Sequence, residues 1–246
     1  MKQVLIVGAT SGISKALAYH FASKHVNLIL AGRDMEEINR LATDLEIRYG
    51  IHANTIYFDA LKEENISSFF ERCLQLTGDL DGIIVSYGLM HDQKEMEQNR
   101  SSIREMINVN FTSVVYILEE AARFFEKKQK GFICAISSVA GDRGRRNNYI
   151  YGASKGAITV YLQGLRNRLA HSKVNVLTVK PGFVDTKMTY GLLKPSILVA
   201  PPRTIAASIY KSILKKKEIL YTPWYWFYIM QVIRMVPEKL FKFIKW

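Results

Sequence analysis

Apolar residues recur along this chain in two alternating patterns, short continuous runs and longer stretches with helical spacing. A short uninterrupted run is typical of a strand buried on both faces of a parallel sheet, whereas apolar positions three and four apart predict an amphipathic helix. The runs predict seven strands, over residues 3–7, 26–31, 53–58, 82–86, 132–137, 174–179 and 218–221. The helical spacing predicts helices over residues 15–24, 35–49, 61–76, 100–128, 151–170 and 202–217. This alternation predicts an α/β fold, a single doubly wound parallel seven-stranded sheet of the Rossmann type.

The length of 246 residues suits one domain with a sizeable core. We expect a dinucleotide-binding domain over residues 1–222, with a C-terminal amphipathic extension of it over residues 223–246. Two cysteines make no disulfide framework, and five histidines without ligand spacing make no metal set. We therefore expect no metal and a reducing, cytoplasmic location.

A glycine-containing turn, Gly8-Ala9-Thr10-Ser11-Gly12-Ile13-Ser14, joins the first strand to the first helix. This arrangement places backbone N–H groups and a helix N-terminus where a phosphate can bind. The alternative is a tight turn with no ligand. Ser14 stands where a third glycine is expected, so we expect less close packing of helix on strand there.

The second strand ends at Gly32-Arg33-Asp34, which bears on the choice of cofactor. In dinucleotide folds an acidic residue near this point binds the ribose 2′-OH, whereas an arginine suits a 2′-phosphate. Gly32 occupies the acidic position and Arg33 follows it, which favours NADP. Asp34 is interpreted as the N-cap of helix 35–49. If Asp34 bound the ribose instead, NAD would be the cofactor.

Tyr151 and Lys155 lie one turn apart on the helix predicted over residues 151–170, so they share a face. A nearby ammonium lowers the pKa of a phenol, which can then exchange a proton with an alcohol or ketone. The alternative is a half-buried tyrosine beside a surface lysine.

Asn110 interrupts the pattern of helix 100–128, because its amide competes for backbone groups. We interpret it as a kink with a polar role or as a solvent-facing residue.

Ligands of such sheets bind beyond the carboxyl ends of the strands. The residues that fall at these ends are Gly8, Gly32, Asp59, Ser86, Ser138 and Pro181. In order along the chain, Gly8-x-x-x-Gly12, Asn110, Ser138, Tyr151-x-x-x-Lys155 and Pro181-Gly182 resemble the short-chain dehydrogenase/reductase family over residues 2–221.

That resemblance implies an NAD(P)H-dependent oxidoreductase that reduces a ketone to an alcohol. By this likeness Tyr151 is the general acid/base, and Ser138 binds the substrate oxygen. Lys155 lowers the pKa of Tyr151 and binds the nicotinamide ribose, and Asn110 holds a water in the proton relay.

The resemblance also implies a cofactor site in which Asp59 contacts the adenine, and Val184 and Thr186 contact the carboxamide. Its residues are Gly8, Thr10, Ser11, Gly12, Ile13, Arg33, Asp59, Ala60, Ser86, Gly88, Tyr151, Lys155, Pro181, Gly182, Val184 and Thr186. Two departures from the family pattern are Ser14 and the sequence Val-Ser-Tyr-Gly at residues 85–88, where the family commonly has Asn-Asn-Ala-Gly.

A narrower likeness, carried by residues 84–89, 137–146 and 224–246, is to the reductases that partner bacterial polyprenyl-phosphoryl-ribose epimerases. Those reductases act on a keto sugar linked to a lipid phosphate and use NADH, so NAD remains the alternative cofactor.

Arg143, Arg145 and Arg146 lie between Ser138 and Tyr151. We expect them to bind a substrate phosphate, for which a planar guanidinium is well suited. The alternative is a solvated loop.

The charge is concentrated at the C-terminal end. Residues 194–246 hold ten basic and two acidic residues, so they carry +8 of the net +12. Residues 224–236 are rich in aromatic side chains but too few to span a bilayer. Beyond Pro237, Lys239, Lys242 and Lys245 recur opposite apolar residues, the pattern of an interfacial helix.

We therefore predict a peripheral contact of residues 223–246 with an anionic membrane, the alternative being a subunit interface. A homo-oligomer, dimer or tetramer, is expected, and no nucleic acid, because no RNA-binding motif is evident. The open functional alternatives are a reductase of another apolar carbonyl, fatty acyl or steroid-like, and a non-catalytic dinucleotide-binding protein.

Overall fold

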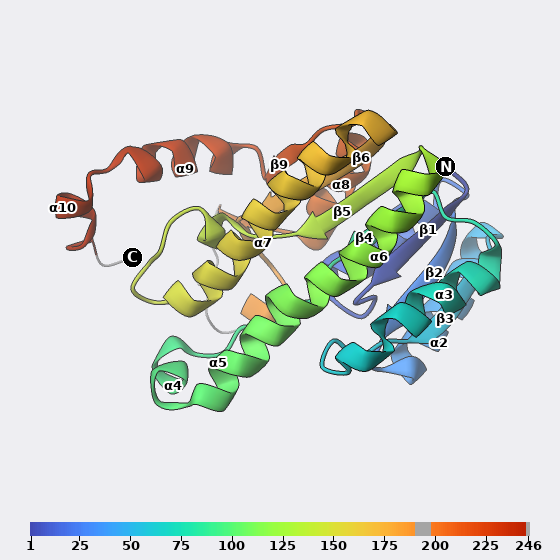
Figure 1. Cartoon of the computed structure of the whole chain (residues 1–246), viewed down its shortest axis with the longest axis horizontal. Coiled ribbons are helices and arrows are strands. Elements are labelled where there is room, and N and C mark those ends of the chain that lie inside the picture. The colour runs from blue at the N-terminus through green and yellow to red at the C-terminus, as the bar shows by residue number, and fades with distance from the viewer. Residues whose placement is uncertain (190–197, 245–246) are drawn as a thin grey trace.

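A parallel seven-stranded sheet forms the centre of the computed structural model, which describes residues 1–189 and 198–244, and helices cover both of its faces (Figure 1). The strand order is β3-β2-β1-β4-β5-β6-β9. The strands are β1 (Gln3–Val7), β2 (Asn27–Gly32), β3 (Ala53–Tyr57), β4 (Gly82–Val85), β5 (Gly131–Ile136), β6 (Val174–Pro181) and β9 (Ile219–Thr222). The predicted fold class is confirmed.

The helices form two layers. On one face lie α1 (Gly12–Ala22), α2 (Met35–Tyr49) and α8 (Pro202–Leu214), and on the other α3 (Ile66–Thr77), α6 (Ser113–Lys128) and α7 (Tyr149–Leu169). Successive residues of β1 alternate between these layers. Val4 and Ile6 pack with the first layer, and Leu5 and Val7 with the second. This burial on both faces is why the strand is apolar at every position.

The long helix predicted over residues 100–128 is interrupted. It consists of α5 (Arg100–Ile107), a π-helical turn (Asn108–Thr112) and α6. In the turn the N–H of Ser113 bonds to the carbonyl of Asn108, five residues earlier. Asn110 within it is fully buried, so the solvent-facing interpretation is wrong and the polar interruption is correct.

Other elements carried too little pattern to be predicted. The short helix α4 (Gln93–Gln98) is capped by Asp92, whose carboxylate accepts from the N–H groups of Lys94 and Glu95. A separate two-stranded parallel sheet joins β7 (Phe183–Val184) to β8 (Val199–Ala200). The helix α4 lies between β4 and α5, and the strands β7 and β8 lie between β6 and α8.

The C-terminal segment forms α9 (Tyr225–Met235) and the short α10 (Glu238–Phe241). Figure 1 shows both helices, in red, extending away from the sheet beyond β9. Trp226 and Met230 on the inner side of α9 pack against Val139, which follows β5. Among the described residues, no helix has both the length and the apolar character that crossing a membrane requires. The helical pattern expected beyond Pro237 covers only one turn, and Lys245 lies outside the described residues.

Candidate active site

Two contiguous cavities, of about 530 and 330 Å³, lie along the carboxyl ends of the parallel strands and together form a cleft. Every residue that the sequence predicted for the cofactor site lines one or both of them, and Ser138 lines the larger. Ser138, Tyr151 and Lys155 line the larger cavity, Asp59 lines the smaller one, and Arg33 lines both. Sites of this size at this sheet edge are where α/β proteins bind ligands.

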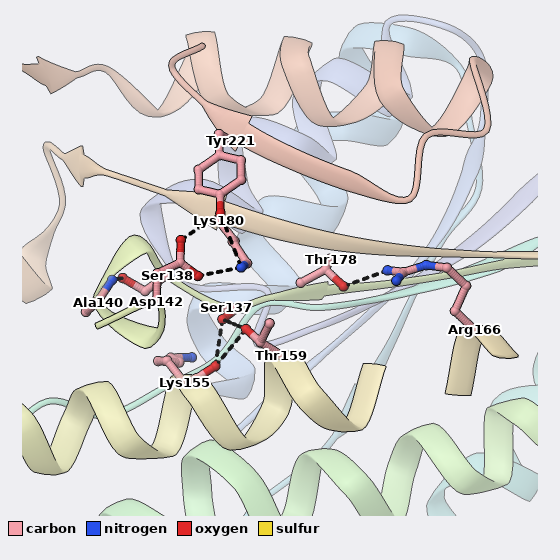
Figure 2. A network of polar contacts seen from close by, with 10 residues as sticks. All are labelled: Ser137, Ser138, Ala140, Asp142, Lys155, Thr159, Arg166, Thr178, Lys180 and Tyr221. Carbon is pink, nitrogen blue, oxygen red and sulfur yellow. Dashed lines mark hydrogen bonds and ion pairs between the residues drawn. The ribbon is translucent and has the colours of Figure 1, made fainter. Parts of the chain in front are cut away.

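Glycines bring the loop after β5 into direct contact with α7. A Cβ atom added to Gly141 would lie 2.6 Å from the carbonyl carbon of Lys155, and one added to Gly152 would lie 2.8 Å from the carbonyl oxygen of Ala140. The backbones therefore touch, and no side chain fits between them. The Ser137 hydroxyl, bonded to the Lys155 carbonyl at 2.9 Å and to Thr159 at 2.8 Å, fixes the same contact (Figure 2).

Tyr151 lies in an apolar environment that includes Met96 and Met106. Burial raises the pKa of its phenol to about 12, although a hydrogen bond with Ser138 and the charge of Arg145 lower it in part. The spacing of Tyr151 and Lys155 predicts that the lysine lowers this pKa below its ordinary value. In the structure desolvation outweighs the nearby groups, so that expectation is wrong for this geometry.

Lys155 is buried behind Tyr151. Its Nζ lies 5.9 Å from the centroid of the Tyr151 ring and donates to the carbonyl of Ile136 at 3.1 Å. Burial lowers the pKa of this ammonium to about 8. The two side chains nevertheless share one helix face and meet at the cavity, which is the arrangement that the Tyr-x-x-x-Lys spacing predicted.

Asn110 stands just behind the cavity wall. Its amide nitrogen donates to the carbonyl of Leu89 at 2.8 Å and to the Ser154 hydroxyl at 3.1 Å, and its oxygen accepts from the Leu89 N–H at 2.7 Å. The side chain thus ties the segment after β4 to α7. A Cβ on Gly88 would lie 3.3 Å from both Asn110 Oδ1 and Lys155 Nζ, so all three groups meet there. The water-holding role of Asn110 stays a prediction.

The turn after β1 has the form of a phosphate cradle. Ser11 caps α1 by accepting from the N–H of Ser14 at 3.1 Å, and it donates to the buried Ser14 hydroxyl at 2.9 Å. Ser14 therefore fits in place of a third glycine. Gly8 has φ +85°, and a Cβ there would lie 2.7 Å from the Cβ of Tyr87, so only glycine suits this position.

Arg33 and Asp34 have separate roles at the far end of the cleft. Asp34 accepts from the N–H of Glu37 at 2.9 Å and so caps α2, as predicted. Glu37 in turn forms an ion pair with Lys15. Arg33 is exposed and lines both cavities, which leaves its guanidinium positioned to meet an anionic group.

The three loop arginines are not equivalent, and none is among the described residues that line either cavity. Arg143 donates to the carbonyls of Ile233 at 3.0 Å and Val236 at 2.7 Å, and its guanidinium lies 4.0 Å from the centroid of the Phe241 ring. Its expected place at a substrate phosphate is therefore wrong. Arg145 is buried, and its charge acts on Tyr151 and Asp142, while Arg146 is exposed.

Several cavity residues were missed because they come from connecting segments without a pattern. Leu89 and Met90 follow β4, and Lys187 and Met188 lie in the turn after β7. Ile136, at the end of β5, was predicted only as part of a strand. A closer interpretation of the residues just beyond each strand would have found Leu89 and Met90.

Comparison with known proteins agrees with this geometry. The family model described as short chain dehydrogenase matches residues 2–195. An uncharacterised oxidoreductase of Staphylococcus epidermidis is 30% identical over 190 residues, which is 77% of this chain and 81% of the relative.

Two solved structures share the fold. A short-chain dehydrogenase from Sphingobium yanoikuyae, solved in complex with NADPH, has a TM-score of 0.84 and 22% identity over 97% of both chains. An alcohol dehydrogenase from the archaeon Thermococcus sibiricus, complexed with 5-hydroxy-NADP, has a TM-score of 0.79 and 25% identity over 90% of this chain and 95% of its own. The chain thus belongs to the short-chain dehydrogenase family and is an oxidoreductase.

Proposed function

We propose that the protein reduces a ketone to a secondary alcohol with NADPH, and that Tyr151 supplies the proton. The observation that carries this proposal is that Ser138, Tyr151 and Lys155 line the larger cavity together, with Ser138 hydrogen-bonded to Tyr151. A phenol and a hydroxyl side by side can both bond to one carbonyl oxygen, which a ketone substrate provides.

The residues present fit a dinucleotide. The N-terminus of α1 with its Ser11 cap suits the pyrophosphate, and the residues after β6 line the end of the cleft next to Tyr151. A bound nicotinamide would supply the hydride. Ser138 then holds the carbonyl oxygen, and Tyr151 gives that oxygen the proton that completes the alcohol. Lys155, behind the phenol, would bind the ribose of the nicotinamide.

The protonation state of Tyr151 favours reduction over oxidation. With a pKa of about 12, the phenol keeps its proton at neutral pH and is ready to act as an acid. Alcohol oxidation would require the phenolate, which is scarce until the pH is well above neutral. We expect the oxidation rate to rise steeply with pH, and the reduction rate to change little between pH 6 and 8.

NADPH oxidation in the presence of a panel of ketones tests the activity. Tyr151→Phe keeps the ring but removes the proton, so we expect turnover to fall by about 10² to 10⁴-fold. Melting temperature and NADPH binding, followed by its fluorescence, serve as controls that the variant is folded. Undiminished turnover in Tyr151→Phe would exclude the assigned role.

The preference for NADP rests on Arg33, because Asp34 is used as a helix cap. The Thermococcus relative, solved with 5-hydroxy-NADP, supports the same choice. We expect Arg33→Ala to weaken binding of NADPH and to leave binding of NADH nearly unchanged. If both cofactors lose affinity equally, Arg33 does not contact a 2′-phosphate, and NAD becomes the better assignment.

For the substrate we propose the keto group of a sugar linked to a lipid phosphate. Arg145 is buried and acts on Tyr151 through its charge, whereas Arg146, the next residue of the same loop, is exposed. Arg146 is therefore the arginine that we propose for the substrate phosphate. Arg146→Ala should raise the KM of the phosphorylated substrate and leave that of a phosphate-free analogue unchanged. Equal effects on both would contradict a phosphate site.

The second candidate substrate is another apolar ketone, such as a fatty acyl or steroid-like carbonyl. The larger cavity favours it through apolar side chains, since Leu89, Met90, Ile136 and Met188 all line it. A panel that compares phosphorylated with purely apolar ketones by kcat/KM separates the two candidates.

The outer surface of the C-terminal segment supports a peripheral contact with an anionic bilayer. Its exposed apolar side chains are Trp224, Phe227, Tyr228, Val232, Met235, Leu240, Phe243 and Ile244, accompanied by Arg234, Lys239 and Lys242. Aromatic and basic groups on one surface suit a membrane interface.

Sedimentation with vesicles containing anionic phosphatidylglycerol tests this contact. We expect the variant Trp224→Ser/Val232→Ser to lose vesicle binding while it keeps its oligomeric state. Unchanged sedimentation with a smaller oligomer would instead make this surface a subunit interface. The dimer or tetramer expected from the sequence stays a prediction.

A further inference from the structure

A buried ion pair lies directly behind the cleft. Lys180 Nζ contacts Asp142 Oδ1 at 2.5 Å, and the Tyr221 hydroxyl donates to Asp142 Oδ2 at 2.7 Å (Figure 2). The side chains of Lys180 and Asp142 are only 6% and 3% exposed. The Lys180 ammonium also lies 5.2 Å from the centroid of the Tyr221 ring. Each oxygen of the carboxylate therefore has its own donor.

This pair connects the two segments that meet at the reaction centre. Asp142 stands four residues after Ser138, in the loop that follows β5. Lys180 stands immediately before Pro181 and Gly182, which line the cleft. Tyr221 belongs to β9, the neighbour of β6. The ion pair thus joins the loop that carries Ser138 to the segment expected beside the nicotinamide.

Backbone pairing alone does not fix these two segments relative to each other. The ladder between β5 and β6 ends at the pair Ile136 and Val179, followed by one bond from the Ser137 N–H to the Val179 carbonyl. Beyond that point the Ser138 loop turns toward α7, and β6 continues along β9. The ion pair is formed across this divergence.

A buried ion pair of this kind is weak evidence of a stabilising role. Burying two charges has a desolvation cost that their attraction often only offsets, and apolar pairs of similar volume are often as stable or more stable. A charge pair with a hydroxyl on its second oxygen does, however, select one arrangement of its partners. The directional contact between the two diverging segments is the feature that an apolar pair would lack.

We propose that Asp142 and Lys180 are positioning residues that set Ser138 relative to Pro181 and Gly182, and so set the carbonyl of the substrate against the hydride donor. The effect on turnover rests on the proposed function, but the effect on the loop does not. Misplacement of reacting groups by about 1 Å can lower a rate by about 10²-fold.

The decisive variant removes both charges together. A single change at Asp142 leaves the Lys180 charge buried and unpaired, so the chain is at risk of unfolding for that reason alone. In Asp142→Leu/Lys180→Met neither charge remains, and we expect a melting temperature within a few degrees of the wild type. We expect its kcat to fall by about 10 to 100-fold with a smaller change in KM, and the isotope effect with deuterated NADPH to increase.

Thr178→Val is the matched control. Thr178 lies on β6 two residues before Lys180, and its hydroxyl accepts from Arg166 Nη2 at 2.9 Å (Figure 2). Arg166 also donates to the Glu218 carbonyl at 2.8 Å, so this contact braces β6 and β9 away from the cleft. We expect this variant to lose stability while the kcat and the isotope effect remain those of the wild type.

Hydrogen exchange separates this proposal from the proposed function. In Asp142→Leu/Lys180→Met, amides of residues 138–146 should exchange at least ten times faster, while those of β5 and the centre of α7 keep their protection. Unchanged exchange in this loop would overturn the proposal, whether or not the protein reduces ketones. Wild-type kcat in the double variant would also overturn it, whereas a wild-type protein that reduces no ketone would overturn the proposed function alone.

Discussion

The loop that carries Ser138 is held on two sides by contacts of opposite kinds. Toward α7 the contact is between backbones, at Gly141 and Gly152, with no space for a Cβ atom. Toward the C-terminal segment it is made by long side chains, above all Arg143, which reaches the carbonyls at the end of α9. A contact between backbones permits one distance only, whereas a guanidinium can follow a helix that moves. The first contact fixes the loop of Ser138 against the helix that carries Tyr151 and Lys155, and the second attaches an outer surface to that loop.

Replacing a glycine of the first contact should have the largest effect. A Cβ at position 141 meets backbone atoms of Lys155 and Gly156 at 2.6 to 2.8 Å, so Gly141→Ala must push the loop away from α7. We expect a loss of about 3 kcal/mol in the free energy of unfolding and at least a hundredfold loss of turnover. Urea denaturation and ketone-dependent NADPH oxidation measure the two effects.

Gly164→Ala, in the helix that Gly141 contacts, is the control for that change. Nothing lies within 4 Å of a Cβ at position 164, so the alanine should stabilise α7 by about 0.5 to 1 kcal/mol. A loss at position 164 as large as that at position 141 would show that any added methyl group has this effect, and that the backbone contact between the loop and α7 does not determine the outcome.

The α7 side also carries an electrostatic cost that depends on pH. The pKa of Lys155 is lowered by burial from 10.5 to about 8, so between these values only the unfolded chain keeps the proton. Burial of the charged lysine therefore lowers the free energy of unfolding by its full amount below pH 8. This destabilisation disappears as the pH rises to 10.5. The stability of Lys155→Met relative to the wild type should therefore fall by about 3 kcal/mol between pH 8 and 10.5.

Chemical denaturation of the two proteins at half-unit pH steps, without nucleotide, measures this difference. The hydrogen bond that Lys155 makes to the Ile136 carbonyl adds an offset, so the slope with pH, and not the absolute value, is the test. If the difference in free energy of unfolding between the two proteins does not change from pH 8 to 10.5, the lysine is not desolvated.

On the C-terminal side the effects should be smaller. Arg143→Ala removes bonds to three carbonyls and the contact with Phe241, which we expect to lower the free energy of unfolding by about 2 kcal/mol. Turnover should remain within about threefold of the wild type. Arg143 also forms an ion pair of 2.8 Å with the exposed carboxylate of Glu238, so Glu238→Gln should change stability by less than about 0.5 kcal/mol. A hundredfold loss of turnover in Arg143→Ala would show that the contact with the C-terminal segment sets the active-site geometry as strictly as the contact with α7 does.

The outward surface of α9 should tolerate change best. Val232→Ser and Met235→Ser alter exposed side chains, so stability should remain within about 0.5 kcal/mol of the wild type. Met230→Ser, on the buried side of the same helix, is the contrast and should lose about 2 kcal/mol or more. Thermal unfolding of the three variants is sufficient to compare the two sides of the helix.

The sequence predicted what depends on local pattern. Apolar runs located the central strands to within a residue or two, because burial on both faces demands apolar residues throughout. The interruption at Asn110 was also visible, since an amide that competes for backbone groups is unusual within a helix. Tyr151 and Lys155 were found by their spacing, and the cofactor residues by the resemblance to a family.

What the sequence did not predict depends on contacts between distant segments. Gly141 and Gly152 carry no pattern that reveals a backbone lying against them. Arg143 was assigned to the cleft because it lies between Ser138 and Tyr151, but its partners are some 90 residues later in the chain. The pKa of Tyr151 is raised by burial among side chains such as Met96 and Met106. These lie far from Tyr151 in the sequence, so its spacing from Lys155 does not reveal them.

The indole of Trp226 gives this protein an optical reporter of its own. The ring is fully buried, and its Nε1 faces Gly182 so closely that a Cβ there would lie 1.8 Å from it. Tryptophan emission overlaps the absorption of a reduced nicotinamide, and Gly182 lines the cavity proposed to hold that ring. Resonance energy transfer from Trp226 should therefore quench its fluorescence when reduced cofactor binds, and a titration can follow occupancy without any label.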